Sequence, residues 1–381
     1  MSSVERVLVV GGGIGGLSTT MGLRRAGIEV DVVELNPAWD VYGVGIIQPG
    51  NAVRALDALG LARRAIEEGF GFSGSRMHLA DGTMVATQDA PPLAGAEYPP
   101  MNGITRPRLH EIFTSAVLES GARVVLGESV ERIDQLADRV DVAFTDGTSA
   151  TYHLVVGADG INSRVRAMVF DPDLRPSYTG QVCWRYNVPR PEDLDGIWMF
   201  MGSRGKAGIV PLAPDLAYLL LIEQPPVGDD GEPVVRLGVE GLAGIMRERL
   251  AEYGGLIGDL RDRCVRDDAA VVYRPVERVM LPAPWHRGRV VLVGDAAHAT
   301  SPHIGQGAAM AIEDAVVLAE ELASDQPVDQ ALASYMARRE PRARFVFDTS
   351  RRIQELELAH DHGPENSELI VQSMIRTAEP I

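Results

Sequence analysis

The sequence predicts an α/β fold, in which a Rossmann-like dinucleotide-binding domain carries an inserted domain built on an antiparallel sheet. Three observations predict it. An apolar strand that runs into a glycine-rich turn and then a helix occupies residues 7–16. Two further apolar strands end in glycine turns, at 154–160 and 289–295. Between these two, residues 178–222 alternate polar and apolar in short runs separated by turn signals, which is typical of antiparallel strands.

Length, charge and cysteine content limit the possible functions. At 381 residues the chain exceeds what one hydrophobic core usually organises, so two domains are expected. A formal net charge of −17 argues against nucleic acid or an anionic membrane surface as a partner. There is no apolar run long enough to span a membrane, and the two cysteines are too few for a disulfide framework. We therefore predict a cytoplasmic protein without an integral membrane segment.

The first glycine-rich turn has the spacing of a dinucleotide-binding motif. Gly11, Gly13 and Gly16 fit G-x-G-x-x-G, in which the first glycine allows the tight turn, the second admits a pyrophosphate and the third lets helix and strand pack closely. The helix beginning near Gly13 offers free N–H groups to the phosphates. Glu34 lies in the next strand, 29–35, about 20 residues further on, where an acid hydrogen-bonds the ribose hydroxyls. A carboxylate there disfavours a 2′-phosphate, so the motif predicts FAD or NAD, with an empty structural turn as the alternative.

The remaining pattern places the other elements in order. Residues 70–100 are rich in Gly and Pro and predict short strands and turns. The tail after Gly363 is polar and uninformative. Helices are expected at 51–59, 61–68, 104–120, 242–253, 256–264, 308–322 and 329–356, and strands at 122–126, 130–133 and 140–144, the last followed by a hairpin turn at Asp146-Gly147.

Two loops carry further candidate ligands. Asp159, flanked by small residues, either binds a ribose or caps the next helix, and isolated chemistry favours the cap. Gly43 and Gly45 stand beside small apolar residues and suggest backbone that runs close to a flat ligand, with an ordinary surface loop as an equal alternative.

Together the turns at 11–16, 157–160 and 294–307 resemble those of the class A flavoprotein aromatic hydroxylases, the family of para-hydroxybenzoate and salicylate hydroxylases. Residues 157–160 are similar to the family's second fingerprint and Gly294-Asp295 to its third, while Pro302 and 305–307 match the loop beside the isoalloxazine. Arg106 matches an arginine before a Leu-His pair near the flavin. The resemblance implies non-covalent FAD bound by Gly11, Gly13, Ile14, Gly15, Gly16, Glu34, Gly45, Arg106, Asp159, Gly294, Asp295, Gly305, Gln306, Gly307 and Ala308.

The resemblance also implies the domains and the reaction. An FAD-binding domain of the para-hydroxybenzoate hydroxylase type would comprise 1–70, 101–172 and 275–345, a substrate-binding sheet 71–100 and 173–274, and a C-terminal helix and tail 346–381. NADH or NADPH, visiting transiently, would reduce FAD; O2 would add at flavin C4a, and the hydroperoxide would transfer OH to an electron-rich aromatic or N-heteroaromatic ring. A helix N-terminus near Gly307 would stabilise the anionic reduced flavin. A monomer or homodimer without a metal site is expected.

The substrate candidates lie on the sheet and beside the flavin loop. Arg185 either pairs a substrate carboxylate or forms a salt bridge at the sheet edge. Tyr218 is a ligand or, more readily, a core residue. His303, next to Pro302, is either a base that deprotonates a phenol or a solvent-facing loop histidine. The further candidates for the roof of the pocket are Tyr186 and Met201.

Three other functions compete with this one. A hydroxylase of a lipophilic quinone or an alkylquinolone would suit an apolar roof. A flavin halogenase needs a Trp-x-Trp-x-Ile-Pro stretch and a lysine near the substrate tunnel, whereas Trp184 here has Tyr186 two positions on and Lys206 is the only lysine. A non-catalytic dinucleotide sensor would not need the loop at 302–307.

Overall fold

The strands that end in glycine turns lie side by side in one sheet. The computed structural model describes residues 4–41, 43–228, 231–361 and 363–381. β1 pairs in parallel with β2 and β12, and β12 pairs in parallel with β19, so the three turns meet at one end of the sheet. Only β18 is antiparallel to its neighbour. From edge to edge the order is β18 (His286–Arg287), β19 (Val290–Leu292), β12 (Leu154–Gly157), β1 (Arg6–Val10), β2 (Glu29–Glu34) and β8 (Arg123–Leu126).

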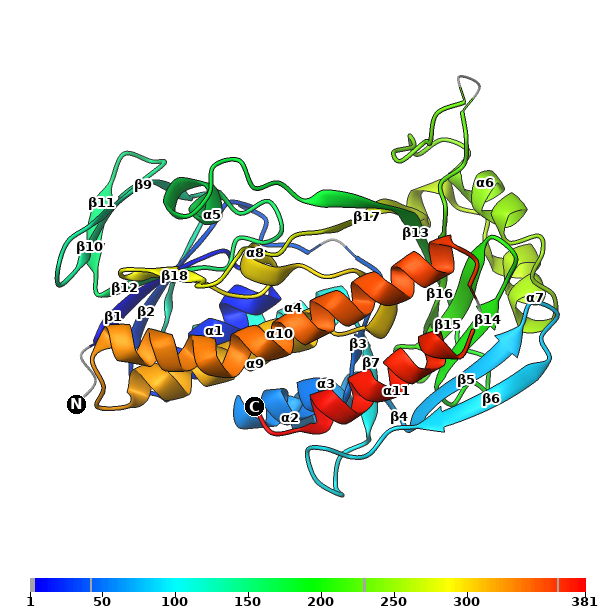
Figure 1. Cartoon of the computed structure of the whole chain (residues 1–381), viewed down its shortest axis with the longest axis horizontal. Coiled ribbons are helices and arrows are strands. Elements are labelled where there is room, and N and C mark those ends of the chain that lie inside the picture. Colours follow the sequence, from blue (N-terminus) through cyan, green and yellow to red (C-terminus); the bar gives the residue numbers. More distant parts are fainter. Residues whose placement is uncertain (1–3, 42, 229–230, 362) are drawn as a thin grey trace.

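This sheet is covered on both faces, which explains its continuous apolar strands. Figure 1 shows helices below it and a small antiparallel sheet above it. α1 packs against both α4 and α9, and α10 packs along α9 before continuing toward the other half of the molecule. The covering elements are α1 (Ile14–Arg25), α4 (Arg106–Glu119), α9 (Gly307–Ala323), α10 (Val328–Leu358), β9 (Val130–Gln135), β10 (Val140–Phe144) and β11 (Ser149–Tyr152).

Shorter elements surround the turns. A three-stranded sheet has the order β3 (Gly45–Gln48), β7 (Met101–Thr105) and β4 (Phe70–Phe72). The others are α2 (Gly50–Ala58), α3 (Ala62–Glu67), α5 (Arg164–Val169), α8 (Asp295–His298) and two 3-10 turns, Asp268–Ala270 and Pro302–Ile304.

The second half of the molecule is built on a seven-stranded sheet that is mixed, not wholly antiparallel as predicted. β14 pairs in parallel with β5, because β5 arrives from residues 70–100 and not through a hairpin. β17 runs across the predicted boundary at 274 and pairs with β13 on both sides of it, with a shift in register between Tyr178 and Val182. The order is β17 (Val272–Arg278), β13 (Ser177–Pro189), β16 (Leu216–Glu223), β15 (Gly205–Pro211), β14 (Ile197–Met201), β5 (Gly74–Leu79) and β6 (Met84–Asp89).

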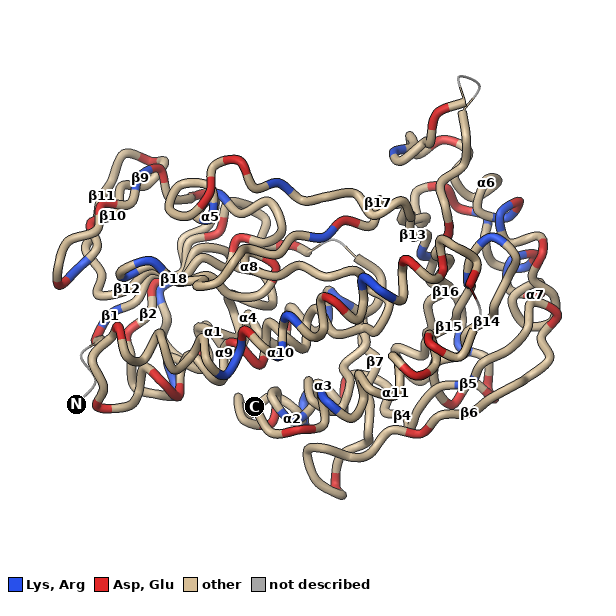
Figure 2. The backbone as a smooth tube through the Cα atoms, viewed as in Figure 1, with Lys and Arg blue, Asp and Glu red and all other residues tan. Residues whose placement is uncertain are grey.

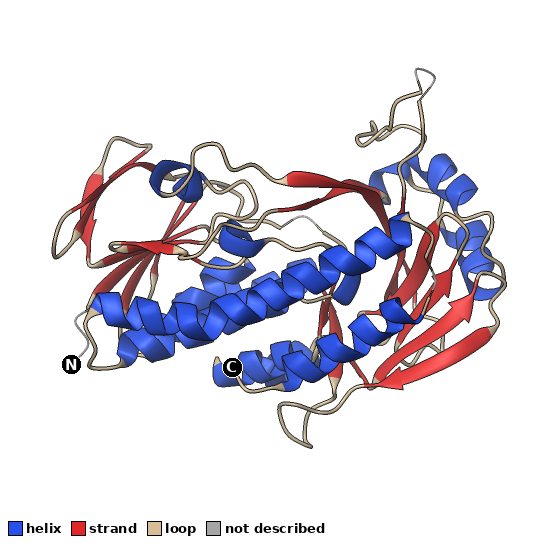
Figure 3. Ribbon diagram, viewed as in Figure 1, coloured by secondary structure: helices blue, strands red, loops and turns tan. Residues whose placement is uncertain are grey.

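The two faces of this sheet have different partners. Trp184 and Tyr186 point to the face covered by α6 (Leu242–Arg249) and α7 (Gly255–Cys264), where they join an apolar core. These helices lie on the outer side of the sheet in Figure 3. Cys183 and Tyr218 point to the opposite face and pack with Val44 of the first half. Strand alternation therefore gives one face to the core and the other to the junction between the halves.

The tail after Gly363 is not structureless. Residues 364–378 form α11 (Pro364–Ala378), which begins with a proline at its first helical position. Its apolar residues do not all face inward: Val371 and Ile375 remain exposed, while Ser373 and Thr377 are buried. The helix forms against α2 and α10.

Candidate functional site

Of the three glycines that fit G-x-G-x-x-G, two are closely packed and one faces open space. A Cβ on Gly11 would lie 2.5 Å from the carbonyl oxygen of Ala158, and one on Gly16 would lie 1.8 Å from that of Gly11. A Cβ on Gly13 would meet no atom within 4 Å. Gly13 is also the N-cap of α1, and Ile14 begins the helix. The turn thus leaves room at the helix N-terminus for a phosphate, as the expected cofactor requires.

Glu34 is fixed beside this turn. Its Oε2 accepts a hydrogen bond from Gly12 N at 2.6 Å, and its Oε1 accepts one from Asn36 N at 2.7 Å. Each carboxylate oxygen keeps a further lone pair for a ribose hydroxyl. These acceptor oxygens, with their negative charge, therefore fit an adenosine without a 2′-phosphate.

A tryptophan and a histidine that sequence reasoning missed both contact the backbone of the same turn. The carbonyl oxygen of Gly12 accepts a hydrogen bond from Trp39 Nε1 at 3.1 Å and lies 2.9 Å from His110 Nε2. His110 is the histidine of the Leu-His pair after Arg106, and that pair was the only sequence signal.

Asp159 caps α5. Its carboxylate accepts hydrogen bonds from the backbone N–H groups of Arg164 and Val165, at 2.7 and 3.0 Å, and from the Ser163 hydroxyl. The local geometry matches the capping interpretation, since Oδ2 accepts from both backbone N–H groups and Oδ1 from the hydroxyl.

At the third turn an acid and two arginines come together. Gly294, with φ of 56°, donates its N–H to Asp314 Oδ2 at 2.8 Å and leaves Asp295 exposed. Arg106 is surrounded by protein, yet its side chain remains accessible to solvent. Burial lowers the pKa of Arg106, the carboxylate of Asp295 opposes this, and the charge of Arg185 adds to it. The three charged groups thus share one region between the two halves.

The predicted flavin loop is held by a buried pair of amides. Gly305 has φ of 64°, and α9 begins at Gly307, followed by the half-buried Ala308. Gln306 Oε1 accepts from Asn51 Nδ2 at 2.9 Å, and Gln306 Nε2 donates to Asn51 Oδ1 at 3.2 Å. The loop is therefore fixed to the start of α2.

Two adjacent acids in the second turn of α9 anchor these loops. Glu313 accepts from Asn51 Nδ2 at 2.9 Å, and Asp314 binds both Gly294 N and His298 Nε2. Arg339 of α10 pairs with each acid at 2.7 Å, and all three side chains are fully buried. Burial alone would raise the pKa of Asp314, but His298 and Arg339 outweigh it and hold that pKa below its usual range. An acid pair inside the otherwise apolar stretch 307–319 was the available sequence signal.

The sheet face toward the first half carries two of the substrate candidates. Arg185 and Tyr218 belong to it by strand alternation, whereas Tyr186 lies on the opposite face, so its prediction as a roof residue is wrong. A Cβ on Gly45 would lie 2.5 Å from the Tyr218 ring, which brings β3 directly beneath the sheet. Burial raises the pKa of Tyr218 to about 12, with Arg185 opposing. Tyr218 is therefore a neutral phenol at physiological pH.

His303 is not a solvent-facing residue. Its side chain is fully buried, with Nδ1 3.0 Å from Ser301 Oγ and Nε2 2.9 Å from Gln181 Oε1. Nε2 also lies 3.3 Å from Glu357 Oε2, and Glu357 pairs with Lys206. Burial and the charge of Lys206 lower the pKa of His303. Because acceptors face Nε2 and Ser301 occupies Nδ1, the ring links the loop after Pro302 to the sheet and to α10.

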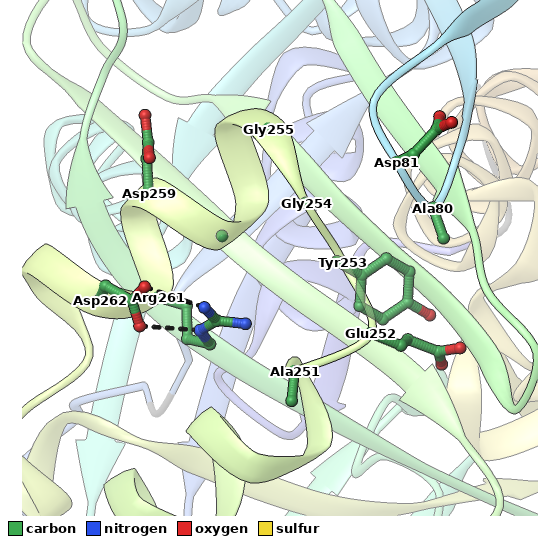
Figure 4. Close-up of a pocket in the computed structure, with 11 residues that line it drawn as sticks. Ala80, Asp81, Ala251, Glu252, Tyr253, Gly254, Gly255, Asp259, Arg261 and Asp262 are labelled. Carbon is green, nitrogen blue, oxygen red and sulfur yellow. Dashed lines mark hydrogen bonds and ion pairs between the residues drawn. The ribbon is translucent and has the colours of Figure 1, made fainter.

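Two other surface features are present, the first next to the partners of His303. Met201 lines a narrow opening next to Lys206 and Glu357. A separate hollow of about 570 Å³, lined by Asp81, Tyr253, Asp259 and their neighbours, lies at the far end of the second half (Figures 1 and 4). Among the described residues no His, Cys, Asp and Glu side chains gather as a metal site would require, and no helix is long and apolar enough to cross a membrane.

Comparison with known proteins agrees with this geometry. The family model described as "FAD binding domain" matches residues 5–233 and 272–350. The putative FAD-dependent monooxygenase YetM of Bacillus subtilis is 32% identical over 365 residues, covering 95% of this chain and 96% of that protein. The 2-heptyl-3-hydroxy-4(1H)-quinolone synthase of Pseudomonas aeruginosa is 32% identical, covering 89% and 86%.

A solved structure extends the similarity to the whole fold. Klebsiella pneumoniae HpxO, complexed with FAD and uric acid, superposes with a TM-score of 0.81 at 27% identity, covering 99% of this chain and 93% of that one. With Gly13 open to a phosphate and Glu34 poised for a ribose, the residues present fit FAD. The chain belongs to the FAD-binding family of class A flavoprotein monooxygenases.

Proposed function

We propose that this FAD-dependent monooxygenase uses NADH or NADPH and O2 to hydroxylate an electron-rich aromatic or N-heteroaromatic small molecule at the junction of its two halves. One observation carries the proposal. Ala311, in the first turns of α9, lies 3.7 Å from a Cβ built on Gly15 and 2.9 Å from one built on Gly294. The first glycine turn, the third turn and the helix that follows the flavin loop therefore converge.

The cofactor would be held by residues from all three segments. The turn around Gly13 would take the pyrophosphate, Glu34 the adenosine ribose, Asp295 the ribityl chain, and residues 305–308 the ring. Bound FAD supplies the activation of O2. The protein's own contribution is to hold the substrate ring near the flavin and to keep water away from it.

The charged groups at the junction of the two halves favour a substrate with an anionic or hydrogen-bond-accepting group. Arg185 and Arg106 act on each other electrostatically, and Asp295 is the acid beside them. Tyr218, a neutral phenol, can donate a hydrogen bond but cannot serve as a base at pH 7. His303 is best described as a positioning residue of the flavin loop beside Pro302, because both ring nitrogens already have partners.

A second substrate class is favoured by the rest of that face. Its other side chains are largely aliphatic: Val44, Val210, Leu212, Leu220, Ile222, Val272 and Val276. These side chains are buried against one another, so an alkyl chain that enters between the halves would meet an apolar environment, and one relative is named for a 2-heptylquinolone product. An alkylquinolone is therefore the alternative substrate.

The test is a substrate screen with the purified, FAD-loaded protein. Aromatic acids, uncharged N-heterocycles and alkylquinolones are added separately, and NADH or NADPH oxidation is followed together with the product mass. At least one class should accelerate oxidation and yield a product that has gained one oxygen atom. If no class does so, the proposed function is wrong.

A matched pair of variants separates the two substrate classes. For an aromatic acid, Arg185→Gln should raise KM, since a charged hydrogen bond is lost. Arg190→Gln, whose side chain binds carbonyl groups outside this face, should leave KM unchanged. For an alkylquinolone, neither variant should alter KM appreciably.

We also propose a cytoplasmic location and a monomeric or homodimeric state. Both cysteines, Cys183 and Cys264, are free, which suits a reducing compartment. Size-exclusion chromatography with light scattering measures the oligomeric state directly.

A further inference from the structure

The last helix, α11, lies beyond the residues that the family model matches, yet one arginine joins it to the flavin loop. Arg342 of α10 donates through Nε and Nη2 to the two carboxylate oxygens of Glu313, each at 2.8 Å. It also donates through Nη1 to the carbonyl of Arg376 at 2.8 Å and through Nη2 to that of Thr377 at 2.6 Å. We propose that α11 is a positioning element for the flavin loop at 305–307, acting through Arg342 and Glu313.

A continuous set of buried contacts leads from Glu313 to the loop. Glu313 accepts from Asn51 Nδ2, and Asn51 exchanges two hydrogen bonds with the side chain of Gln306. Asn51 is 1% exposed, Gln306 5% and Glu313 0%. Because water does not reach these groups, a partner lost at one end is not replaced, and the remaining side chains must shift or stay unsatisfied.

The carbonyl end of α11 is fixed at a second point. Arg54 of α2 donates to the carbonyls of Ala378 and Glu379, at 2.9 and 2.7 Å. Arginines at this end satisfy the last carbonyls and complement the negative end of the helix dipole. We call the contacts of Arg54 and Arg342 with the carbonyls of 376–379 the C-terminal anchor. Since α2 also carries Asn51, which binds Gln306, the anchor contacts the helix that holds the flavin loop as well as α10; α11 lies beside α2 in Figure 1.

Arg342 also balances charge in α9. Glu313 and Asp314 are neutralised by Arg339 and Arg342 in a region closed to solvent. Loss of Arg342 would leave excess negative charge in the second turn of α9, the helix expected to direct its N-terminus at the flavin. That charge opposes the anionic reduced flavin, so both FAD affinity and the midpoint potential should fall.

The experiment measures FAD binding and flavin potential, neither of which depends on the substrate proposal. Arg342→Met removes the link to Glu313, and Gln372→Pro breaks α11 at an exposed interior position. The matched controls are Arg338→Met and Gln372→Ala. Arg338 binds Glu320, Glu321 and the carbonyl of Ile381, so its loss does not touch Glu313. We expect both test variants to weaken FAD binding at least about fivefold, the lower end of usual coupling between linked sites. Of these two, only Arg342→Met removes a charge, so it should also lower the midpoint potential. The controls should stay within about twofold.

Each other result overturns the proposal. Unchanged affinity and potential in both test variants would show that neither Arg342 nor α11 positions the loop. A loss of FAD affinity in Arg342→Met alone would remove α11 from the account, and an equal loss in Arg338→Met would reduce it to general stability. Should Arg342→Met not fold, Arg342→Lys keeps the charge but loses the two-point contact, and a wild-type affinity in that variant contradicts the proposal equally.

Discussion

Gly13 differs from the other glycines of its motif in what surrounds it. A Cβ there meets no protein atom within 4 Å, whereas Gly11 and Gly16 are pressed against backbone. Gly13→Ala should therefore cost the FAD-free protein less than about 1 kcal/mol, the difference between good and poor N-caps. It should weaken FAD binding by about 1–3 kcal/mol, roughly 5- to 150-fold, because the methyl group occupies the expected phosphate position.

Thermal unfolding of the FAD-free variant and titration with FAD measure the two quantities separately. Gly244→Ala, at another glycine with open space around it, is the control and should leave FAD binding unchanged. A wild-type affinity in Gly13→Ala would mean that the cofactor does not approach this turn.

Individual residues of the site show how much of it could be predicted from the sequence alone. Spacing is a local property, so the G-x-G-x-x-G turn and the acid of the next strand were identified directly. Which side chains of a strand face the junction could not be predicted in this way. Arg185 and Tyr186 are adjacent, and only the pairing with β16 decides which of them faces the junction. The burial of His303 depends on Gln181 and Glu357, more than fifty residues away on either side, and no local pattern contains that information.

At the scale of elements, the last turn of α10 joins the two halves through a buried ion pair. Burial would raise the pKa of Glu357, but Lys206 outweighs it and lowers that pKa from 4.5 to about 2. The pair therefore contributes stability above pH 4.5, and this contribution is lost as the pH falls through about 2. Lys206→Met should cost about 3–5 kcal/mol at pH 7, because it leaves a buried unpaired carboxylate.

The pH dependence of the free energy of unfolding tests whether the loss in Lys206→Met comes from the unpaired carboxylate. In Lys206→Met, burial raises the pKa of Glu357, so protonation at lower pH relieves the penalty and the difference from the wild type should narrow between about pH 7 and pH 5. Urea unfolding at both pH values measures it. Arg351→Met, which breaks an exposed pair with Glu355, should cost less than about 1 kcal/mol at both. A pH-independent loss in Lys206→Met would mean that the lysine acts by packing.

Elements were predictable where their partners are near in sequence. The β-α-β unit at 6–34 and the hairpin at 146–147 follow from local pattern. The parallel pairing of β14 with β5 joins segments more than a hundred residues apart, and hairpin signals say nothing about it. α11 was missed although Ile370, Val371, Met374 and Ile375 recur at helical spacing in the tail. Its docking depends on arginines of α2 and α10, and no local pattern contains that information.

At the scale of the whole molecule, a protein with a net charge of −17 must bind anionic partners, FAD and NAD(P)H. Figure 2 shows acidic residues over both halves, not gathered at one end. Arg106 and Arg185 lie at the junction, but their effect on a distant anion competes with the field of the entire surface. The balance depends on the screening length, which falls from about 30 Å at 0.01 M salt to about 10 Å at 0.1 M.

We expect the repulsion by the whole molecule to dominate at low salt. The second-order rate constant for flavin reduction by NADH should then rise as salt increases from about 0.01 to 0.1 M, because screening removes long-range repulsion and leaves the local arginines in place. Stopped-flow absorbance of the flavin measures the rate, with FAD saturation checked at each salt concentration and NaCl compared with KCl to exclude a specific ion effect. A rate constant that falls with salt would mean that basic groups at the junction, and not the net charge, control the approach of the nicotinamide.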